Sequence, residues 1–115
     1  MKRIGIIGGG NMGTAIIGSI FEKYSVAVCE QDQQKAKFLQ RKFGAVVQNL
    51  AELVQQSDVI IVAVKPQDVA ELGEKIKHLV NKSSVVVSIA AGLKIFKIQK
   101  LFGHKKVLRM MPNWI

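Results

Sequence analysis

Short apolar runs alternate along this chain with segments in which apolar residues recur every three or four positions. Short apolar runs are typical of buried β-strands, and the longer period is typical of amphipathic helices. Six runs are predicted to be strands: Arg3–Ile7, Ser25–Cys29, Ala45–Val47, Val59–Val64, Val85–Ile89 and about Lys106–Met110. Five helices are predicted between them: Asn11 to about Lys23, about Gln33–Phe43, a short helix after Asn49 that ends near Gln56, one from about Asp68 with Leu79 and Val80 still in phase, and about Lys94–Phe102.

This strict alternation predicts an α/β fold with a doubly wound parallel sheet of about six strands. The helices should cover both faces of the sheet through right-handed crossovers. The length of 115 residues fits a single domain, residues 1–115. Gly44 and Gly103 read as helix stop signals, and Asn49 with Glu52 has the spacing of a capping pair.

Composition supports an ordered globular domain, with 49% hydrophobic and 22% charged residues. No apolar run reaches the roughly 18 residues that a membrane-spanning helix needs. Glycines interrupt the first apolar segment, which makes it a poor signal peptide. We therefore expect a cytoplasmic protein with no membrane contact.

The single cysteine, Cys29, is expected to be a small buried hydrophobe at a strand end rather than a reactive thiol.

The net charge of +9 raises the question of an anionic partner. Lys94, Lys97 and Lys100 recur every three residues, which places them on one helix face. A solvated helix face explains this spacing, and attraction of phosphate groups comes second. Nucleic acid is not an expected partner, because the lysines are scattered over most of the predicted helices.

A glycine-rich segment carries the strongest local signal. Gly8, Gly10 and Gly13 fit the pattern G-x-G-x-x-G, directly after a predicted strand and at the start of a predicted helix. In a Rossmann-like fold the first glycine permits a tight turn, the second lets a pyrophosphate approach the backbone, and the third lets the helix pack on the strand. The free N–H groups of the helix then face the phosphates. The segment predicts a bound nicotinamide dinucleotide, NADP or NAD.

Glu30 lies 17 residues after Gly13, at the end of the second predicted strand. An acidic residue there can accept hydrogen bonds from both hydroxyls of the adenosine ribose and would repel a 2′-phosphate. This favours NAD over NADP. Lys35 and Lys37 lie nearby and could still meet a phosphate, so the cofactor preference stays open.

Three further segments fall at the carboxyl ends of predicted strands: Ala63-Val64-Lys65-Pro66-Gln67, Val87-Ser88-Ile89-Ala90-Ala91-Gly92 and Val107-Leu108-Arg109-Met110-Met111-Pro112-Asn113. Ligands of open α/β sheets bind at this edge. Together with Gly8-Gly9-Gly10-Asn11-Met12, and in this order, the segments resemble those of pyrroline-5-carboxylate reductases. The resemblance covers the chain up to Asn113.

The resemblance implies the remaining site residues. The pyrophosphate would be held by Gly8, Gly9, Gly10, Asn11, Met12 and Gly13, the cofactor would be lined by Ala63, Val64, Lys65 and Pro66, and the next wall would be formed by Ala90, Ala91 and Gly92. Asn49 would lie near the adenosine, and Asn113 is the candidate on the substrate side. The implied reaction is hydride transfer from the reduced nicotinamide to the C=N bond of a small imine in proline biosynthesis. No catalytic acid or base is assigned, since His78 and His104 are expected at the surface, and no metal-ligand cluster is present.

Two departures from the family bear on activity. Trp114 and Ile115 follow Asn113 where the family continues with Thr and Pro, and the helical domain that forms the dimer and most of the substrate pocket is absent. A shortened or frameshifted gene or an expressed fragment would explain this. A non-catalytic dinucleotide-binding remnant or sensor is therefore a second interpretation. A third is another reductase with a similar first domain, such as a β-hydroxyacid dehydrogenase or a deazaflavin-dependent oxidoreductase, and homo-oligomer formation stays open.

Overall fold

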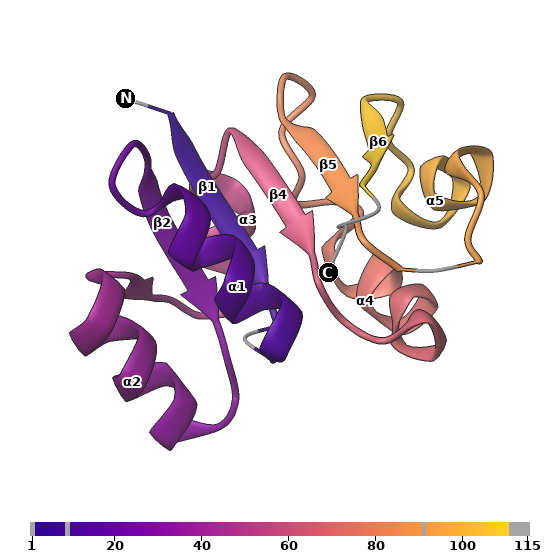
Figure 1. The fold of residues 1–115 in the computed structure, drawn as a ribbon. Helices are drawn as coiled ribbons and strands as arrows, with labels where there is room; N and C mark the ends of the chain where they lie inside the picture. The colour runs from indigo at the N-terminus through magenta and orange to yellow at the C-terminus, as the bar shows by residue number, and fades with distance from the viewer. Residues whose placement is uncertain (1, 9, 91, 111–115) are drawn as a thin grey trace.

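The computed structural model describes residues 2–8, 10–90 and 92–110 and shows a single parallel sheet with helices on both faces (Figure 1). The strands are β1 Arg3–Ile7, β2 Ser25–Cys29, β3 Val46–Val47, β4 Val59–Val62, β5 Val85–Ser88 and β6 Val107–Arg109. The helices are α1 Asn11–Ile20, α2 Gln33–Phe43, α3 Leu50–Gln56, the short 3-10 helix η1 Pro66–Asp68, α4 Val69–Ile76 and α5 Ile95–Phe102. The predicted fold class is confirmed.

The order of the strands is β3-β2-β1-β4-β5-β6, and every pairing is parallel. The chain therefore winds outward from β1 to β3, crosses back and continues from β4 to β6. Ile7, the last residue of β1, is level with Cys29 on one side and Val62 on the other. The carboxyl ends of the three central strands thus meet at the point where the winding reverses, where open α/β sheets bind their ligands.

The core has two parts, one on each face of the sheet. On one face Ile16 and Ile17 of α1 and Leu39 of α2 pack with Ile6 and Val28 of the strands. On the other face the buried residues come from α3, α4 and α5 as well as from the strands: Leu53, Val54, Val69, Leu72, Ile76, Ile98 and Phe102. Because both faces are covered, the central strands read as continuous apolar runs.

Most predicted helix signals are confirmed in detail. Gly44 and Gly103 have φ values of 68° and 57°, in the left-handed region that a helix-ending glycine supplies. Asn49 caps α3, since its side-chain oxygen accepts a hydrogen bond of 2.9 Å from the backbone N–H of Glu52. The capping pair is reciprocal, because the Asn49 amide also donates to the Glu52 carboxylate at 2.6 Å.

Some helices and strands are shorter than predicted. α1 ends at Ile20 rather than near Lys23, and α4 ends at Ile76 although Leu79 and Val80 were in phase with it. Leu79 and Val80 still pack partly buried against the core, but from the turn that follows α4. β4 and β5 end at Val62 and Ser88, two residues and one residue earlier than predicted.

The expected surface position of His104 was wrong. His78 is exposed, but His104 is only 8% exposed and its Nε2 lies 2.6 Å from the backbone oxygen of Ser84. The left-handed turn at Gly103 brings the backbone N–H of His104 within 3.0 Å of the oxygen of Gln99 and directs the chain back over the end of α5. His104 is therefore a buried structural residue.

None of the helices in the described part of the chain combines the length and the apolarity needed to cross a membrane.

Candidate functional site: a glycine loop and cavity at the carboxyl ends of the strands

The loop after β1 is held against both neighbouring strands. The N–H of Gly8 donates a hydrogen bond of 3.1 Å to the oxygen of Cys29 at the end of β2. Gly8 has a φ of 99°, and a Cβ on it would lie 3.0 Å from the backbone oxygen of Ala63, just beyond β4. Conformation and close approach therefore both call for glycine at position 8.

Gly13 and Gly10 have opposite surroundings. Gly13 is buried in the first turn of α1, and a Cβ there would collide with the backbone oxygen of Gly8. A Cβ on Gly10 would meet nothing within 4 Å. Gly13 thus lets α1 pack on the loop, whereas the space beside Gly10 is open. Gly9 lies outside the described residues.

Gly10 is also the N-cap residue of α1 and, lacking a side chain, makes no side-chain cap for this helix. The first turn contains no acidic residue either. An uncapped helix start has unsatisfied N–H groups and a partial positive charge, which together favour an anionic ligand. Asn11 is exposed and Met12 half-buried in this turn.

A cavity of about 450 Å³ lies beside this loop. Its walls come from the ends of β1 and β2, from the loop after β4, and from α3, η1 and α4: Ile7, Gly8, Cys29, Glu30, Gln31, Leu50, Val64, Asp68, Glu71, Leu72 and Lys75. The volume lies in the range of small-molecule sites. The structure thus brings together three residues predicted from separate motifs, namely Gly8, Glu30 and Val64.

Glu30 is half-buried at the end of β2, and its carboxylate accepts a hydrogen bond of 2.9 Å from the backbone N–H of Asp32. The neighbouring Cys29 is half-buried rather than buried. Burial raises the pKa of the Cys29 thiol, and the adjacent Glu30 carboxylate raises it further. The thiol is therefore protonated at neutral pH, in agreement with the expectation that it is unreactive.

The other predicted site residues that the structure describes do not line this cavity. Asn49 is engaged as the cap of α3. Lys65 is exposed and extended before Pro66, which begins η1, as expected for a residue before proline. Ala63 is half-buried, Ala90 is buried with its N–H 3.2 Å from the Ser88 hydroxyl, and Gly92 has a φ of 81°. Ala91 and Asn113 lie outside the described residues.

Eight wall residues were not predicted as site residues from the sequence: Ile7, Cys29, Gln31, Leu50, Asp68, Glu71, Leu72 and Lys75. Four of them lie at spacings of three, one and three residues along η1 and α4. That spacing indicates a shared helix face. The spacing could have shown from the sequence that these four residues share a face, but not that this face borders a ligand site.

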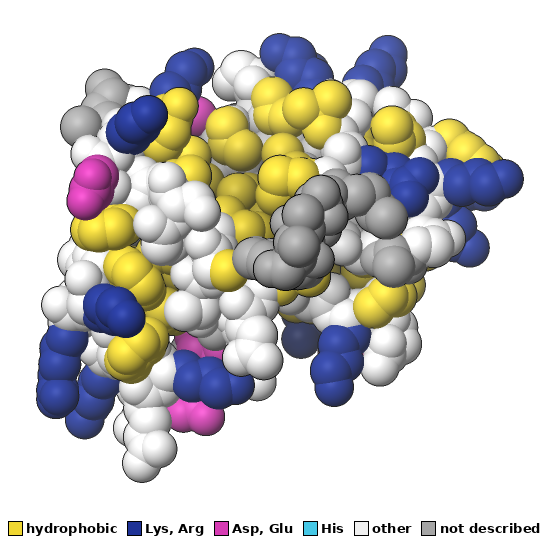
Figure 2. Space-filling model, viewed as in Figure 1, with side chains coloured by type: hydrophobic (Ala, Val, Ile, Leu, Met, Phe, Trp, Pro, Cys, Tyr) yellow, Lys and Arg dark blue, Asp and Glu magenta, His cyan; other side chains and the backbone are white. Residues whose placement is uncertain are grey.

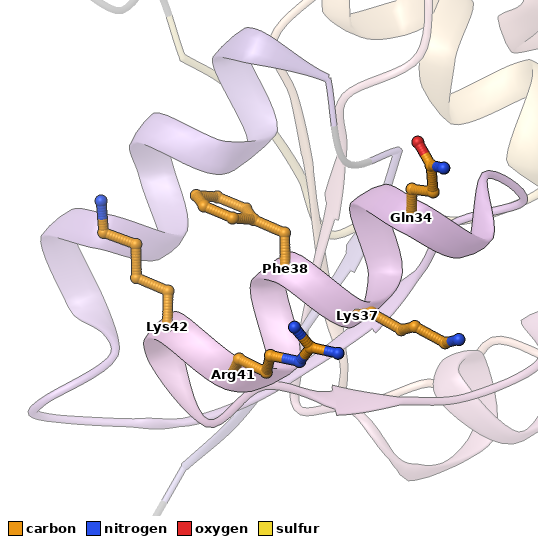
Figure 3. Close-up of a pocket in the computed structure, with 5 residues that line it drawn as sticks. All are labelled: Gln34, Lys37, Phe38, Arg41 and Lys42. Carbon is orange, nitrogen blue, oxygen red and sulfur yellow. The ribbon is translucent and has the colours of Figure 1, made fainter.

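Two further hollows lie around α2. One, of about 400 Å³, is lined by Gln34, Lys37, Phe38, Arg41 and Lys42, all from α2. Figure 3 shows Phe38 and Lys42 on one side of the helix and Lys37 on the other, and the Lys42 ammonium lies 5.5 Å from the centre of the Phe38 ring. Because one helix supplies every wall, this hollow does not enclose a ligand.

The other hollow, of about 280 Å³, lies between α1 and α2 and includes Gly10, Asn11, Thr14 and Lys35. Lys35 therefore faces the open side of the glycine loop. Among the described residues, no three His, Cys, Asp or Glu side chains lie close enough together to hold a metal ion.

Comparison with known proteins agrees with this geometry. Residues 3–92 match the model of a family described as "NADP oxidoreductase coenzyme F420-dependent". The chain belongs to that family. The chain is 37% identical to the pyrroline-5-carboxylate reductase of Escherichia coli K12 over 119 aligned residues. The alignment covers 97% of this chain and 44% of the relative. The resemblance to the cofactor half of these reductases is thereby confirmed.

Solved structures show the same relationship. The pyrroline-5-carboxylate reductase of Coxiella burnetii superposes with a TM-score of 0.90 at 28% identity, over 98% of this chain and 44% of that one. A Plasmodium falciparum pyrroline carboxylate reductase with NADP bound shares the fold, with a TM-score of 0.80 at 23% identity, over 97% of this chain and 42% of that one. This chain thus spans less than half the length of these relatives.

Proposed function

We propose that this chain binds a nicotinamide dinucleotide and presents it for hydride transfer to the C=N bond of a small imine, as in pyrroline-5-carboxylate reductases. The observation that carries the proposal is the glycine loop. A Cβ at Gly13 would collide with the loop, whereas a Cβ at Gly10 would enter open space beside an uncapped helix start. These features fit a pyrophosphate.

In this proposal the pyrophosphate is bound by the loop and the first turn of α1: Gly8, Gly9, Gly10, Asn11, Met12 and Gly13. Glu30 accepts hydrogen bonds from the adenosine ribose, and Asn49 lies toward the adenosine. Val64 lines the cavity beside Glu30. Because a carboxylate at position 30 repels a 2′-phosphate, we propose NAD rather than NADP.

The nicotinamide end is assigned to the neighbouring strand ends. We propose Ala63, Lys65 and Pro66 on one side, Ala90, Ala91 and Gly92 on the next, and Asn113 toward the substrate. The bound dinucleotide supplies the hydride. The chain's own residues hold the cofactor in place and exclude water from one side of it.

The chain spans 44% of the Escherichia coli reductase. We further propose that the chain takes a small imine as its substrate, acts in the cytoplasm and can form homo-oligomers. A second candidate function is that of a dinucleotide-binding protein without catalysis. Proline formation from pyrroline-5-carboxylate and reduced cofactor separates the two, because turnover excludes the non-catalytic function.

The glycine loop is tested by calorimetric titration of NADH into the chain and into Gly10→Val. We expect saturable binding by the chain and a loss of at least about tenfold in affinity for Gly10→Val, since the valine occupies the space where the pyrophosphate must approach. The substituted protein should fold normally, because nothing lies within 4 Å of the new Cβ.

Gly18→Ala is the matched control. It lies on the same helix, where a Cβ would make an ordinary contact of 3.6 Å with the Phe43 ring, and it should bind NADH like the unsubstituted chain. Unchanged affinity in a folded Gly10→Val protein would remove the loop from the site.

A further inference from the structure

The cavity beside the glycine loop has a charge opposite to that of the whole chain. The chain carries 17 Lys and Arg against 8 Asp and Glu. Three acidic residues line the cavity, Glu30, Asp68 and Glu71, against one basic residue, Lys75. Figure 2 shows Lys and Arg side chains around the rim of one face of the molecule, with few Asp or Glu among them. An acidic cavity in a basic protein is thus a local feature of the site.

We propose that Asp68 and Glu71 act with Glu30 to make this cavity select an adenosine without a 2′-phosphate, so that α4 is a second determinant of cofactor choice. This inference rests on the proposed function, since it assigns the adenosine half of the dinucleotide to this cavity. Ile7, Leu50, Val64 and Leu72 supply apolar walls for a flat adenine ring. The carboxylates then border the ribose and the adenine edge.

Asp68 is not engaged by its own helix. It stands at the N-cap position of α4, yet its side chain makes no capping hydrogen bond there. Its backbone N–H donates to the oxygen of Lys65 at 2.9 Å, which fixes the turn of η1. The position of Asp68 is therefore set by the backbone, and its carboxylate contributes negative charge to the cavity.

Glu71 reduces the positive charge available in the cavity. Its carboxylate lies 3.5 Å from the ammonium of Lys75, one turn further along α4. Both side chains are more than half exposed, so the pair adds little to stability. It does keep the one lysine of the cavity wall beside a carboxylate, where the lysine is a poorer partner for a phosphate.

The lysines that could still meet a 2′-phosphate lie elsewhere. Lys35 lines the hollow between α1 and α2, and Lys37 lines the outer side of α2 (Figure 3). Neither lines the cavity that contains Glu30. A phosphate carries a charge of about −1.5 to −2 at neutral pH, so three nearby carboxylates disfavour it.

The test is to titrate NADH and NADPH into the unsubstituted chain, D68N and E71Q, at about 20 mM and about 500 mM salt. At low salt we expect the unsubstituted chain to prefer NADH. Each substitution should improve the affinity for NADPH relative to NADH about threefold to fivefold. The gain should be larger for E71Q, which also frees Lys75, and it should shrink at high salt because exposed charges are screened.

E74Q is the matched control. It removes the same charge from the same helix, but Glu74 does not line the cavity and pairs with Lys77 at 3.2 Å. If D68N and E71Q change the NADH-to-NADPH ratio no more than E74Q does, or if the unsubstituted chain prefers NADPH, the inference is overturned while dinucleotide binding stands. If neither dinucleotide binds the unsubstituted chain, the proposed function fails and the inference with it.

Discussion

At the scale of single residues, the site depends on glycines, which lack a side chain, and on the positions of charged groups. Gly8, Gly10 and Gly13 have different surroundings, so each glycine has its own reason to lack a side chain. These positions could be predicted because the motif has fixed spacing and follows a strand. The inward position of His104 could not, since it depends on a left-handed turn that brings the ring to Ser84, 20 residues earlier.

Glu30 gives the sharpest prediction at this scale. Replacement by serine removes a carboxylate beside the proposed ribose site and leaves a hydroxyl that can donate to a phosphate. We expect Glu30→Ser to improve the affinity for NADPH relative to NADH about fivefold to tenfold, since one adjacent like charge is worth about 1 kcal/mol in water. Binding is measured by the quenching of intrinsic fluorescence.

Glu22→Ser is the control for this change, because Glu22 is exposed in the turn between α1 and β2 and does not line the cavity. An equal shift of the cofactor ratio in both proteins would show that only the net charge matters and that Glu30 is outside the site.

At the scale of elements, local sequence signals set the helix starts and stops. Asn49, Gly44 and Gly103 mark boundaries that the sequence predicts, because capping depends on a few adjacent residues. The early end of α4 could not be predicted. Leu79 and Val80 keep packing against the core from a turn, so the apolar period continues after the helix has ended.

The N-terminus of α2 is capped by Asp32. The Asp32 carboxylate accepts hydrogen bonds from the backbone N–H groups of Gln34 at 2.9 Å and Lys35 at 3.3 Å. The first turn contains no other acidic residue. We therefore expect Asp32→Ala to lower the free energy of unfolding by about 1 kcal/mol, measured by urea denaturation.

Gln33→Ala, at the next position, should leave the urea midpoint unchanged or raise it slightly, because Gln33 makes no capping bond and alanine favours the helix. Equal midpoints for the two variants would mean that the Asp32 cap contributes nothing.

At the scale of the whole molecule, the strand order creates the site. Alternating strands and helices predict a parallel sheet, and the carboxyl edge follows as the place of binding. The sequence did not reveal that η1 and α4 border the cavity. Their residues come to line one cavity with Glu30 only because β4 lies beside β1. Asp68 and Glu71 are about forty positions from Glu30 in the sequence, beyond the reach of local patterns.

We expect a bound dinucleotide to occupy the glycine loop and the neighbouring acidic cavity. Backbone amide chemical shifts, followed by NMR during an NADH titration, test this location directly. We predict the largest saturable changes at Gly8, Gly10, Asn11 and Glu30, with little change at Lys37 and Arg41 on the outer side of α2. Changes centred on the outer side of α2 would place the dinucleotide elsewhere, and no changes at millimolar NADH would show that it does not bind.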